Sequence, residues 1–199
     1  SQDFVLTYDF IEHGVKLTYP TTGAQVAAGD SLRIYWDASE NANTQRIEYS
    51  TDGGGSWQQI VNNIDARQRY YTWFVPVGIS SGKCMIRVVR NVTNEQSSTG
   101  LFVINPAPVV TLAAVQCPEY ISVQWQTIPN ASGYEVMRKI GPSMVVIDTV
   151  TATEYVYGGL SPDSVYYVAV RPILDGMSGY RSLAAKRMPN DGDCTGSIS

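Results

Sequence analysis

The run Tyr49-Ser50-Thr51-Asp52-Gly53-Gly54-Gly55-Ser56-Trp57 decides how this sequence is interpreted. Residues 46–50 before it and 57–61 after it alternate polar and apolar side chains, which is the period of a β-strand. The three glycines can adopt the positive φ angles that a tight strand connection needs, and Asp52 can bond the backbone of its own turn. The run therefore predicts a β-hairpin with Trp57 packed beneath its turn.

The composition of the chain favours a β protein. Its 199 residues include 13 Tyr and 17 Gly, and 44% are hydrophobic, whereas only 16% are charged. That profile suits an extracellular β protein better than a helical cytosolic one. No long segment shows the three-four spacing of apolar residues that an amphipathic helix requires. A chain of this length can hold one large or two ordinary domains.

Charge and cysteine spacing exclude several functions. The net charge is −4, and no segment is basic enough to predict nucleic-acid binding. No apolar run reaches membrane-spanning length and no signal peptide is seen, so we expect a mature product or an excised piece. We also expect a monomer. Three cysteines without a Cys-x-x-Cys pair exclude a zinc knuckle or a thioredoxin-like site on spacing. We expect no metal and no cofactor.

Short alternating segments recur along the chain, which is the mark of a β-sandwich. Seven strands are predicted in the first half, at residues 15–19, 32–37, 46–50, 57–61, 70–75, 83–90 and 98–104. Val15, Leu17 and Tyr19 share one face of the first of these. Arg87 is expected to face solvent. Core side chains are expected at Cys84, Ile86, Val88, Phe102 and Ile104.

The same pattern continues after a short proline-containing segment. Seven further strands are predicted at residues 109–115, 120–126, 133–139, 144–148, 154–157, 165–171 and 180–186. The predicted fold class is therefore all-β, with two antiparallel β-sandwiches in tandem. The chain divides into an N-terminal extension or tail of an upstream domain (1–14), a first sandwich (15–104), a linker (105–108), a second sandwich (109–188) and a C-terminal tail (189–199). Two prolines in four linker residues make a stiff connector, so we expect limited hinge motion.

The second half resembles a fibronectin type III domain. The resemblance lies in Trp125, in Gly133-Tyr134-Glu135-Val136, in Tyr167-Val168-Ala169-Val170-Arg171, and in residues 160–166. The last of these looks like a tyrosine corner, in which the Tyr166 hydroxyl bonds back to nearby backbone. The resemblance implies a non-catalytic extracellular module.

The first half resembles an immunoglobulin-like module of bacterial secreted proteins. The resemblance lies in Pro20-Thr21-Thr22-Gly23, Trp36-Asp37, the 48–54 run, the 73–76 run and Ile86-Arg87-Val88. The same order of modules occurs C-terminal to peptidase domains in large secreted bacterial proteins. The resemblance implies the secreted or cell-surface, non-catalytic tail of such a protein or of a related adhesin.

Two motifs resemble parts of enzymes. Ser50, Asp52, Gly54 and Trp57 fit the Asp-box, a hairpin motif of sialidase-type propellers, but a single copy is best interpreted as a turn that bonds itself. The run 78–82, Gly-Ile-Ser-Ser-Gly, matches a nucleophile elbow without the required strand-to-helix context, and the only histidine, His13, precedes the whole domain. We predict that the chain is not an enzyme.

A disulfide is predicted between Cys117 and Cys194. In a fibronectin-type sandwich the first strand and the last strand end at the same pole, and an extracellular setting permits the bond. Closing so long a loop would contribute roughly 4 kcal/mol in the chain-entropy model. Cys84 is interpreted as a small buried apolar residue. Asn91 and Asn130 begin N-glycosylation patterns, which a bacterial protein would leave bare.

The partner is not specified by any motif. The four tryptophans are interpreted as core and hairpin packing. Arg67, Arg69 and Tyr70 form the most plausible exposed recognition cluster, with a solvated loop edge as the alternative. We therefore predict a spacer and interaction or adhesion platform that meets a protein or glycan at the cell surface. The alternative is a carbohydrate-binding module accessory to a secreted hydrolase.

Overall fold

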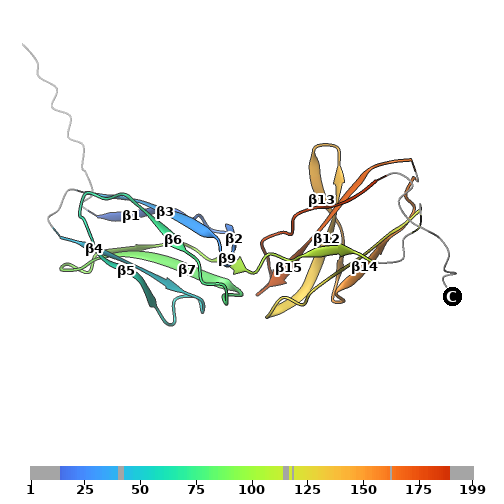
Figure 1. Cartoon of the computed structure of the whole chain (residues 1–199). Coiled ribbons are helices and arrows are strands. Elements are labelled where there is room, and N and C mark those ends of the chain that lie inside the picture. Colours follow the sequence, from blue (N-terminus) through green and yellow to red (C-terminus); the bar gives the residue numbers. More distant parts are fainter. Residues whose placement is uncertain (1–13, 40–42, 114–116, 118, 162, 189–199) are drawn as a thin grey trace, which may run out of the picture.

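The computed structural model describes residues 14–39, 43–113, 117, 119–161 and 163–188. All regular structure in these residues is strand, which confirms the predicted all-β class (Figure 1). The first half holds β1 (Val15–Tyr19), β2 (Gln25–Ala27), β3 (Ser31–Ala38), β4 (Gln45–Ser50), β5 (Gln58–Ile64), β6 (Tyr70–Phe74), β7 (Ser81–Arg90), β8 (Gln96–Ser98) and β9 (Phe102–Asn105). The second half holds β10 (Val110–Leu112), β11 (Ile121–Trp125), β12 (Ala131–Ile140), β13 (Ser143–Val150), β14 (Glu154–Tyr157), β15 (Tyr166–Leu174), β16 (Met177–Ser178) and β17 (Ala185–Arg187).

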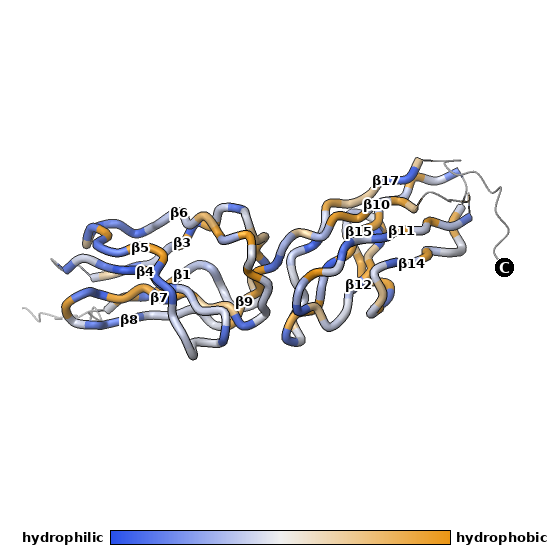
Figure 2. The backbone as a smooth tube through the Cα atoms, turned by 60° about the horizontal axis from the view of Figure 1, so that its bottom comes forward, coloured by the Kyte–Doolittle hydropathy of each residue, from blue (hydrophilic) through white to orange (hydrophobic). Residues whose placement is uncertain are grey.

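The strands form four sheets, two in each half. In the first half, β1-β3-β6 faces β2-β9-β7-β4-β5, with β8 attached to β7. In the second half, β10-β11-β14 faces β13-β12-β15-β16, with β17 attached to β15. Within the described residues no sheet takes strands from both halves, and the two sandwiches lie end to end (Figure 2). The prediction of tandem antiparallel sandwiches is confirmed with one exception, since β2 pairs with β9 in parallel.

Each sandwich has its own core, produced by burial of every second residue. In β3 the inward side chains of Leu32, Ile34 and Trp36 are buried while their neighbours are exposed. The core positions expected on β7 and β9 are all fully buried. The second core forms around Val123, Trp125 and the inward residues of β12 and β15. Because strand side chains alternate between faces, two facing sheets with this pattern enclose apolar side chains without helices.

The sequence prediction was wrong at the last strand of each sandwich. Residues 98–104 do not form one strand, because the Thr99 hydroxyl accepts the Ile86 N–H and separates β8 from β9. Residues 180–186 also do not form one strand: only the start of the short β17 falls within them, and the short β16 ends before them. There the Ser182 hydroxyl, instead of a backbone carbonyl, accepts the Val170 N–H. In both places a side-chain hydroxyl replaces a backbone carbonyl in the hydrogen bonding between strands. An alternation of polar and apolar residues does not reveal such a replacement.

The face assigned to Tyr19 was also wrong. The register between β1 and β3 shifts between Leu17 and Tyr19, so that Thr18 and Tyr19 are both exposed. A β-bulge inserts one residue and re-aims the side chains that follow it. Tyr19 therefore turns away from the core side of the sheet. The short strand β2 was not predicted at all. His13 and Cys194 lie outside the described residues.

Replacing Phe102 by Ala tests the first core. Phe102 is fully buried on β9, so removal of its ring leaves a cavity and should lower the free energy of unfolding by about 3–5 kcal/mol. Calorimetric melting of the full chain should show a lower transition for the first sandwich and an unchanged one for the second. Val92→Ala, at an exposed position of the same sandwich, is the control and should change neither. Equal shifts of both transitions would contradict two separate cores.

Candidate functional site

The turn between β4 and β5 is closed by its own polar side chains. Asp52 Oδ1 accepts hydrogen bonds from the Ser50 hydroxyl (2.6 Å) and the Ser56 N–H (2.9 Å), and Oδ2 accepts the Ser56 hydroxyl (2.6 Å). The Ser50 oxygen in turn accepts the Gly54 N–H (2.9 Å). Gly53 and Gly54 have φ angles of 77° and 95°, which favour glycine. The side chains of Ser50, Asp52 and Ser56 thus all bond within the turn.

These bonds set the charge state of Asp52. Hydrogen bonds from the Ser50 and Ser56 hydroxyls and from the Ser56 N–H favour the ionised carboxylate and hold its pKa well below its usual range. The carboxylate is exposed to solvent, but its oxygens are directed into the turn. The Asp-box interpretation stays a prediction, and the geometry supports a structural role for the four residues that carry it.

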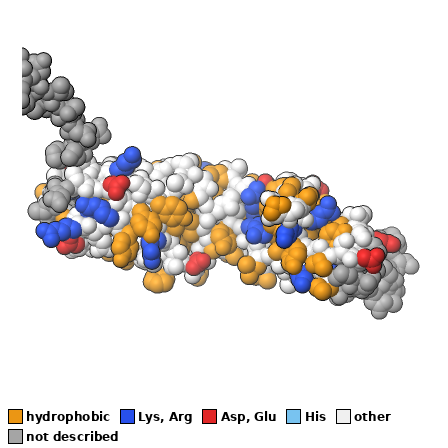
Figure 3. Space-filling model, turned by 90° about the horizontal axis from the view of Figure 1, so that it is seen from above, with side chains coloured by type: hydrophobic (Ala, Val, Ile, Leu, Met, Phe, Trp, Pro, Cys, Tyr) orange, Lys and Arg blue, Asp and Glu red, His pale blue; other side chains and the backbone are white. Residues whose placement is uncertain are grey.

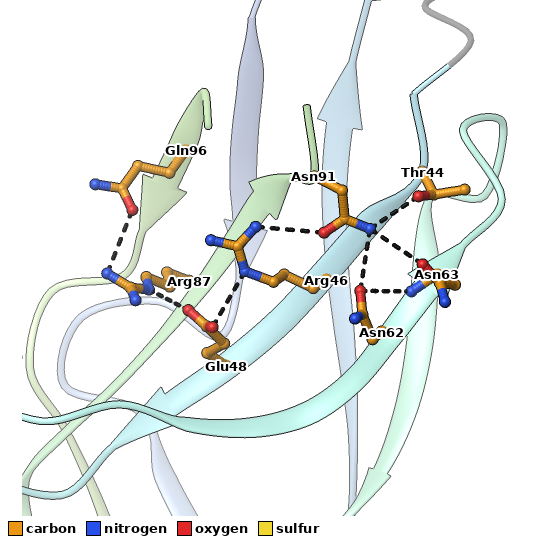
Figure 4. A network of polar contacts seen from close by, with 8 residues as sticks. All are labelled: Thr44, Arg46, Glu48, Asn62, Asn63, Arg87, Asn91 and Gln96. Carbon is orange, nitrogen blue, oxygen red and sulfur yellow. Dashed lines mark hydrogen bonds and ion pairs between the residues drawn. The ribbon is translucent and has the colours of Figure 1, made fainter. Parts of the chain in front are cut away.

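A polar network lies on the outer face of the larger sheet (Figure 4), and its Arg87 side chain covers Trp57. The Arg87 guanidinium lies 4.2 Å from the Trp57 ring centroid. Arg87 Nε also pairs with Glu48 (2.6 Å), which in turn pairs with Arg46 Nε (3.1 Å). The network continues to Asn91, whose side-chain oxygen accepts a hydrogen bond from Arg46 Nη1. Glu48 therefore bridges two arginines, one on β4 and one on β7.

The amides of both N-glycosylation patterns are occupied. Asn91 Nδ2 donates to the Thr44 hydroxyl at 2.8 Å and to the side-chain oxygens of Asn62 and Asn63 at 3.0 and 3.4 Å. Asn130 Nδ2 donates to the Ser80 carbonyl at 2.9 Å. A glycan on either nitrogen would have to displace these contacts.

The three residues of the predicted recognition cluster, Arg67, Arg69 and Tyr70, have different surroundings in the structure. Arg69 donates to the carbonyls of Ala66 (2.7 Å), Gln68 (2.9 Å) and Ala38 (2.8 Å), so its guanidinium ties a loop to the end of β3. Arg67 is exposed, and its backbone N–H bonds the Asp65 carboxylate. Tyr70 begins β6 and is 52% exposed, but the rings beside it come from other strands.

Tyr70 belongs to a row of three tyrosines that crosses β1, β3 and β6. Tyr19 pairs in register with Tyr35, and Tyr35 pairs with Tyr70. Their ring centroids are 6.4 and 6.3 Å apart, and the first two rings are each 40% exposed. Arg33 lies on the same face, 5.5 Å from the Tyr70 ring centroid, and donates to the Tyr35 hydroxyl. We call Tyr19, Tyr35, Tyr70, Arg33 and the 79% exposed Phe74 the tyrosine face.

The tyrosine face combines apolar and basic side chains. Figure 3, which looks down on β1 and β3, shows hydrophobic side chains gathered around basic ones on the first sandwich. A shallow hollow of about 430 Å³ beside the row is lined by Thr18, Tyr19, Tyr35, Trp36, Asp37 and Arg69. Sequence reasoning missed this face because it assigned Tyr19 to the opposite side. The signal for Tyr35 was present, since it alternates with the buried Ile34 and Trp36.

A second polar region lies where the two sandwiches meet. Asn105, the last residue of β9, is fully buried. Its Oδ1 accepts the Tyr180 N–H at 2.7 Å, and its Nδ2 donates to the Tyr180 carbonyl at 3.3 Å and the Pro106 carbonyl at 2.7 Å. One side-chain amide thus reproduces a β-ladder pair with the second sandwich.

Further bonds flank this pair. Asp175 accepts the Gly82 N–H at 3.0 Å and forms an ion pair with Lys83 at 3.2 Å. Both partners favour the ionised form of the Asp175 carboxyl group. The pKa of Asp175 is lowered mainly by the hydrogen bond from the Gly82 N–H. The Ser80 hydroxyl donates to the Pro129 carbonyl at 2.5 Å, and Gln25 Nε2 donates to the Ser178 carbonyl at 3.0 Å.

Two glycines let the backbones approach at this junction. A Cβ at Gly82 would lie 2.2 Å from the Leu174 carbonyl oxygen of the second sandwich. A Cβ at Gly179 would lie 2.6 Å from Asn105 Oδ1. Both distances are too short for any side chain. The junction therefore requires glycine at these positions for close packing and not for an unusual φ angle.

The run that matches a nucleophile elbow lies in the same junction. Ser80 donates its hydroxyl to a backbone carbonyl and is buried, so it acts as a structural donor. An open hollow of about 660 Å³ beside it is lined mainly by polar residues of both sandwiches: Tyr49, Thr51, Asp52, Gln58, Gly78, Ile79, Ser80, Ser81, Lys83, Asn130 and Asp175. No histidine occurs among the residues that the structure describes.

The second sandwich places its marker residues as the fibronectin resemblance requires. Trp125 is buried and packs edge-on against Tyr134 at 5.4 Å. The Tyr166 hydroxyl accepts the Ser161 N–H at 2.9 Å. Cys117 is buried at the pole opposite the junction, and Cys84 is a buried free thiol in the first core. Pairing of Cys117 with Cys194 stays a prediction.

Across the described ranges, no group of three or more His, Cys, Asp or Glu side chains could hold a metal ion. In the same ranges, no helix is long and apolar enough to cross a membrane.

Comparison with known proteins returns fibronectin type III structures. No family model matches the sequence. The chain is similar to a segment of two fibronectin type III domains from chicken tenascin, with 14% identity, 87% of this chain and 97% of that chain covered, and a TM-score of 0.46. It is also similar to the FN1–FN3 domains of chicken CNTN1, with 15% identity, 89% and 68% covered, and a TM-score of 0.39. The single-domain FN3tt matches at 21% identity over 42% of this chain and 92% of its own, with a TM-score of 0.37.

Acid should weaken the turn that Asp52 closes. Its folded pKa lies below the unfolded value of about 4, so its contribution is complete above that pH and is lost as the pH falls through the folded pKa. The Ser56 amide resonance should therefore stay constant from pH 7 to about pH 4 and move only at lower pH. Asp52→Asn should lower the melting temperature more at pH 7 than at pH 3.

The matched control for this experiment is Asp163→Asn, in an exposed loop of the second sandwich. It should show no such difference between the two pH values. Equal effects of the two variants at both pH values would contradict the role given to Asp52.

The disulfide can be tested by mass. Because Cys84 is buried and free, intact non-reduced protein should have the mass expected after loss of two hydrogens, and one peptide pair should link residues 117 and 194. Cys84→Ser should retain that linkage. Two free thiols at Cys117 and Cys194 under non-reducing conditions would reject the pairing.

Proposed function

We propose that this chain is a non-catalytic pair of modules from a secreted or cell-surface bacterial protein. It holds neighbouring parts of that protein apart and presents surfaces for interaction with a protein or glycan partner. Its mechanism is positional, because the two sandwiches lie end to end (Figure 1). The boundaries at 15–104, 105–108 and 109–188 belong to this proposal.

The single observation that carries the spacer role is the bonding of Asn105 across the junction. A buried amide that loses its partners costs about 1–3 kcal/mol, so separation of the sandwiches is opposed at the centre of the contact. The bonds from Ser80, Gly82 and Gln25 lie around it and oppose rotation in several directions. Tandem modules move independently by default, and such a set of directional contacts supports the opposite behaviour here.

The absence of usable chemistry supports the non-catalytic part. Ser80 is bonded to a carbonyl, Asp52 is bonded within its turn, and Asp175 is paired with Lys83. Although these groups all line the hollow of about 660 Å³, each of them is already engaged in a structural contact, and the described residues offer no histidine to act as a base. The secreted location is supported by the composition and by the predicted disulfide.

A second candidate function is carbohydrate binding. The observation that favours it is the row of exposed tyrosines across β1, β3 and β6. Aromatic rings on a rigid sheet offer amphipathic contact area at low entropic cost, which suits a sugar ring with an apolar face and a polar rim. The two roles are compatible, because the row and the junction involve different residues.

Rigidity of the junction can be measured by rotational diffusion. The two sandwiches should tumble with one common diffusion tensor in NMR relaxation and fit one extended shape in small-angle scattering. Gly82→Ala should give the two sandwiches separate diffusion tensors. The added Cβ would lie 2.2 Å from the Leu174 carbonyl oxygen and would push the sandwiches apart. Asn105→Ala should do the same while each sandwich keeps its own melting transition.

The matched control is Gly158→Ala, since a Cβ at Gly158 has open space around it. It should leave the common tensor unchanged. Independent tumbling of the two sandwiches in the unmodified chain would reject the spacer proposal.

A further inference from the structure

Exposure singles out the tyrosine face on the first sandwich. Phe74 and Tyr70 are 79% and 52% exposed although both lie in a strand, and Tyr19 and Tyr35 are 40% exposed. The four tryptophans of the chain, by comparison, are buried or covered. A sheet whose one side packs on the core normally turns polar residues outward on the other side. Clustered exposed rings on that outer side indicate a binding surface.

Arg33 gives this surface an uncompensated charge. Four other arginines pair with carboxylates: Arg46, Arg87, Arg90 and Arg171. Among the described residues Arg33 forms no ion pair, and its guanidinium contacts the Tyr35 hydroxyl and the Tyr70 ring. A guanidinium held in this way can receive a carboxylate in the bidentate geometry that Arg favours.

The direction of the row limits what kind of partner can bind. The three rings stand at paired positions on successive strands, so the row runs across the strands and not along them. A peptide that adds to a sheet does so along an edge strand through backbone hydrogen bonds. The tyrosine face presents only side chains, and its partner must therefore be recognised through rings, hydroxyls and one cation.

The tilt and charge of the face argue against nucleic acid. The first two rings are inclined by 65° and the second two by 42°, so they do not form a flat stack for successive bases. Single-stranded nucleic acid also needs a basic groove along its phosphates, whereas Arg33 is the one cation of the tyrosine face. A sugar chain can place a single carboxylate on Arg33 and meet the tyrosines with its uncharged faces.

We propose that the tyrosine face binds a segment of an acidic polysaccharide, with a uronate carboxylate on Arg33 and sugar rings against Tyr19, Tyr35 and Tyr70. The inference extends the carbohydrate-binding candidate above and is independent of the spacer role. The Tyr35 hydroxyl, which accepts from Arg33, orients the guanidinium between the rings. The hollow beside the row, lined by Thr18 and Asp37, leaves room for a neighbouring sugar.

Calorimetric titration of the full chain with an oligogalacturonate tests the proposal. The fully methyl-esterified oligomer is the matched neutral probe, because it keeps the sugar and removes the charge. We expect the acid form to bind at least about tenfold more tightly than the ester, since a charge-assisted contact is lost. Arg33→Gln and Tyr35→Ala should each weaken binding of the acid form about tenfold.

Tyr167→Ala is the control variant. Tyr167 is a partly exposed tyrosine of the second sandwich with Lys139 and Lys186 beside its ring, and its loss should not change binding. Arg33 is fully exposed, so Arg33→Gln should fold even if Tyr35→Ala does not; circular dichroism and melting check both.

Several outcomes would overturn the proposal. They are the absence of binding to the acid form, equal binding of acid and ester, unchanged binding by Arg33→Gln, and binding of oligothymidylate as strongly as of the oligogalacturonate. None of these results would alter the common tumbling of the sandwiches, so failure here is distinguishable from failure of the spacer role.

Discussion

The buried amide of Asn105 holds the arrangement of this molecule together. Its backbone oxygen accepts the Ala28 N–H, which ends the parallel pairing of β2 with β9 in the first sandwich. Its side chain meanwhile bonds both backbone groups of Tyr180 in the second sandwich. A polar group that is fully buried must have all its bonds made, so the position of one sandwich constrains that of the other. The surrounding contacts depend on this alignment.

Alternation along the chain was sufficient to predict the architecture. Burial imposes a period of two on any strand with one face against a core, and residues such as Leu32, Ile34 and Trp36 carry that period directly. What alternation does not encode is a partner far away in sequence. Tyr19 faces outward because of a bulge, and residues 180–186 lose strand form because Ser182 and Asn105 take ladder positions.

The candidate sites were less predictable for the same reason. Asn105 stands beside two prolines and was assigned to a linker, although its burial is complete. Gly82 and Gly179 carried no sequence signal, because each is needed for a close approach by a residue that is distant in sequence. Tyr70 was correctly expected at the surface, but its neighbours in space, Tyr19 and Tyr35, come from strands far from it in sequence. The Asp52 turn could be predicted because the bonds of its Ser and Asp side chains are local.

The glycine contact between the sandwiches has a consequence for grafting. Two sandwiches that touched only through their linker could be exchanged one at a time. Here a Cβ at Gly82 or Gly179 would meet a residue of the other sandwich, so joining either sandwich to a different neighbour at Pro106 would bring together surfaces that do not fit. A graft into another chain should therefore transplant both sandwiches as one piece.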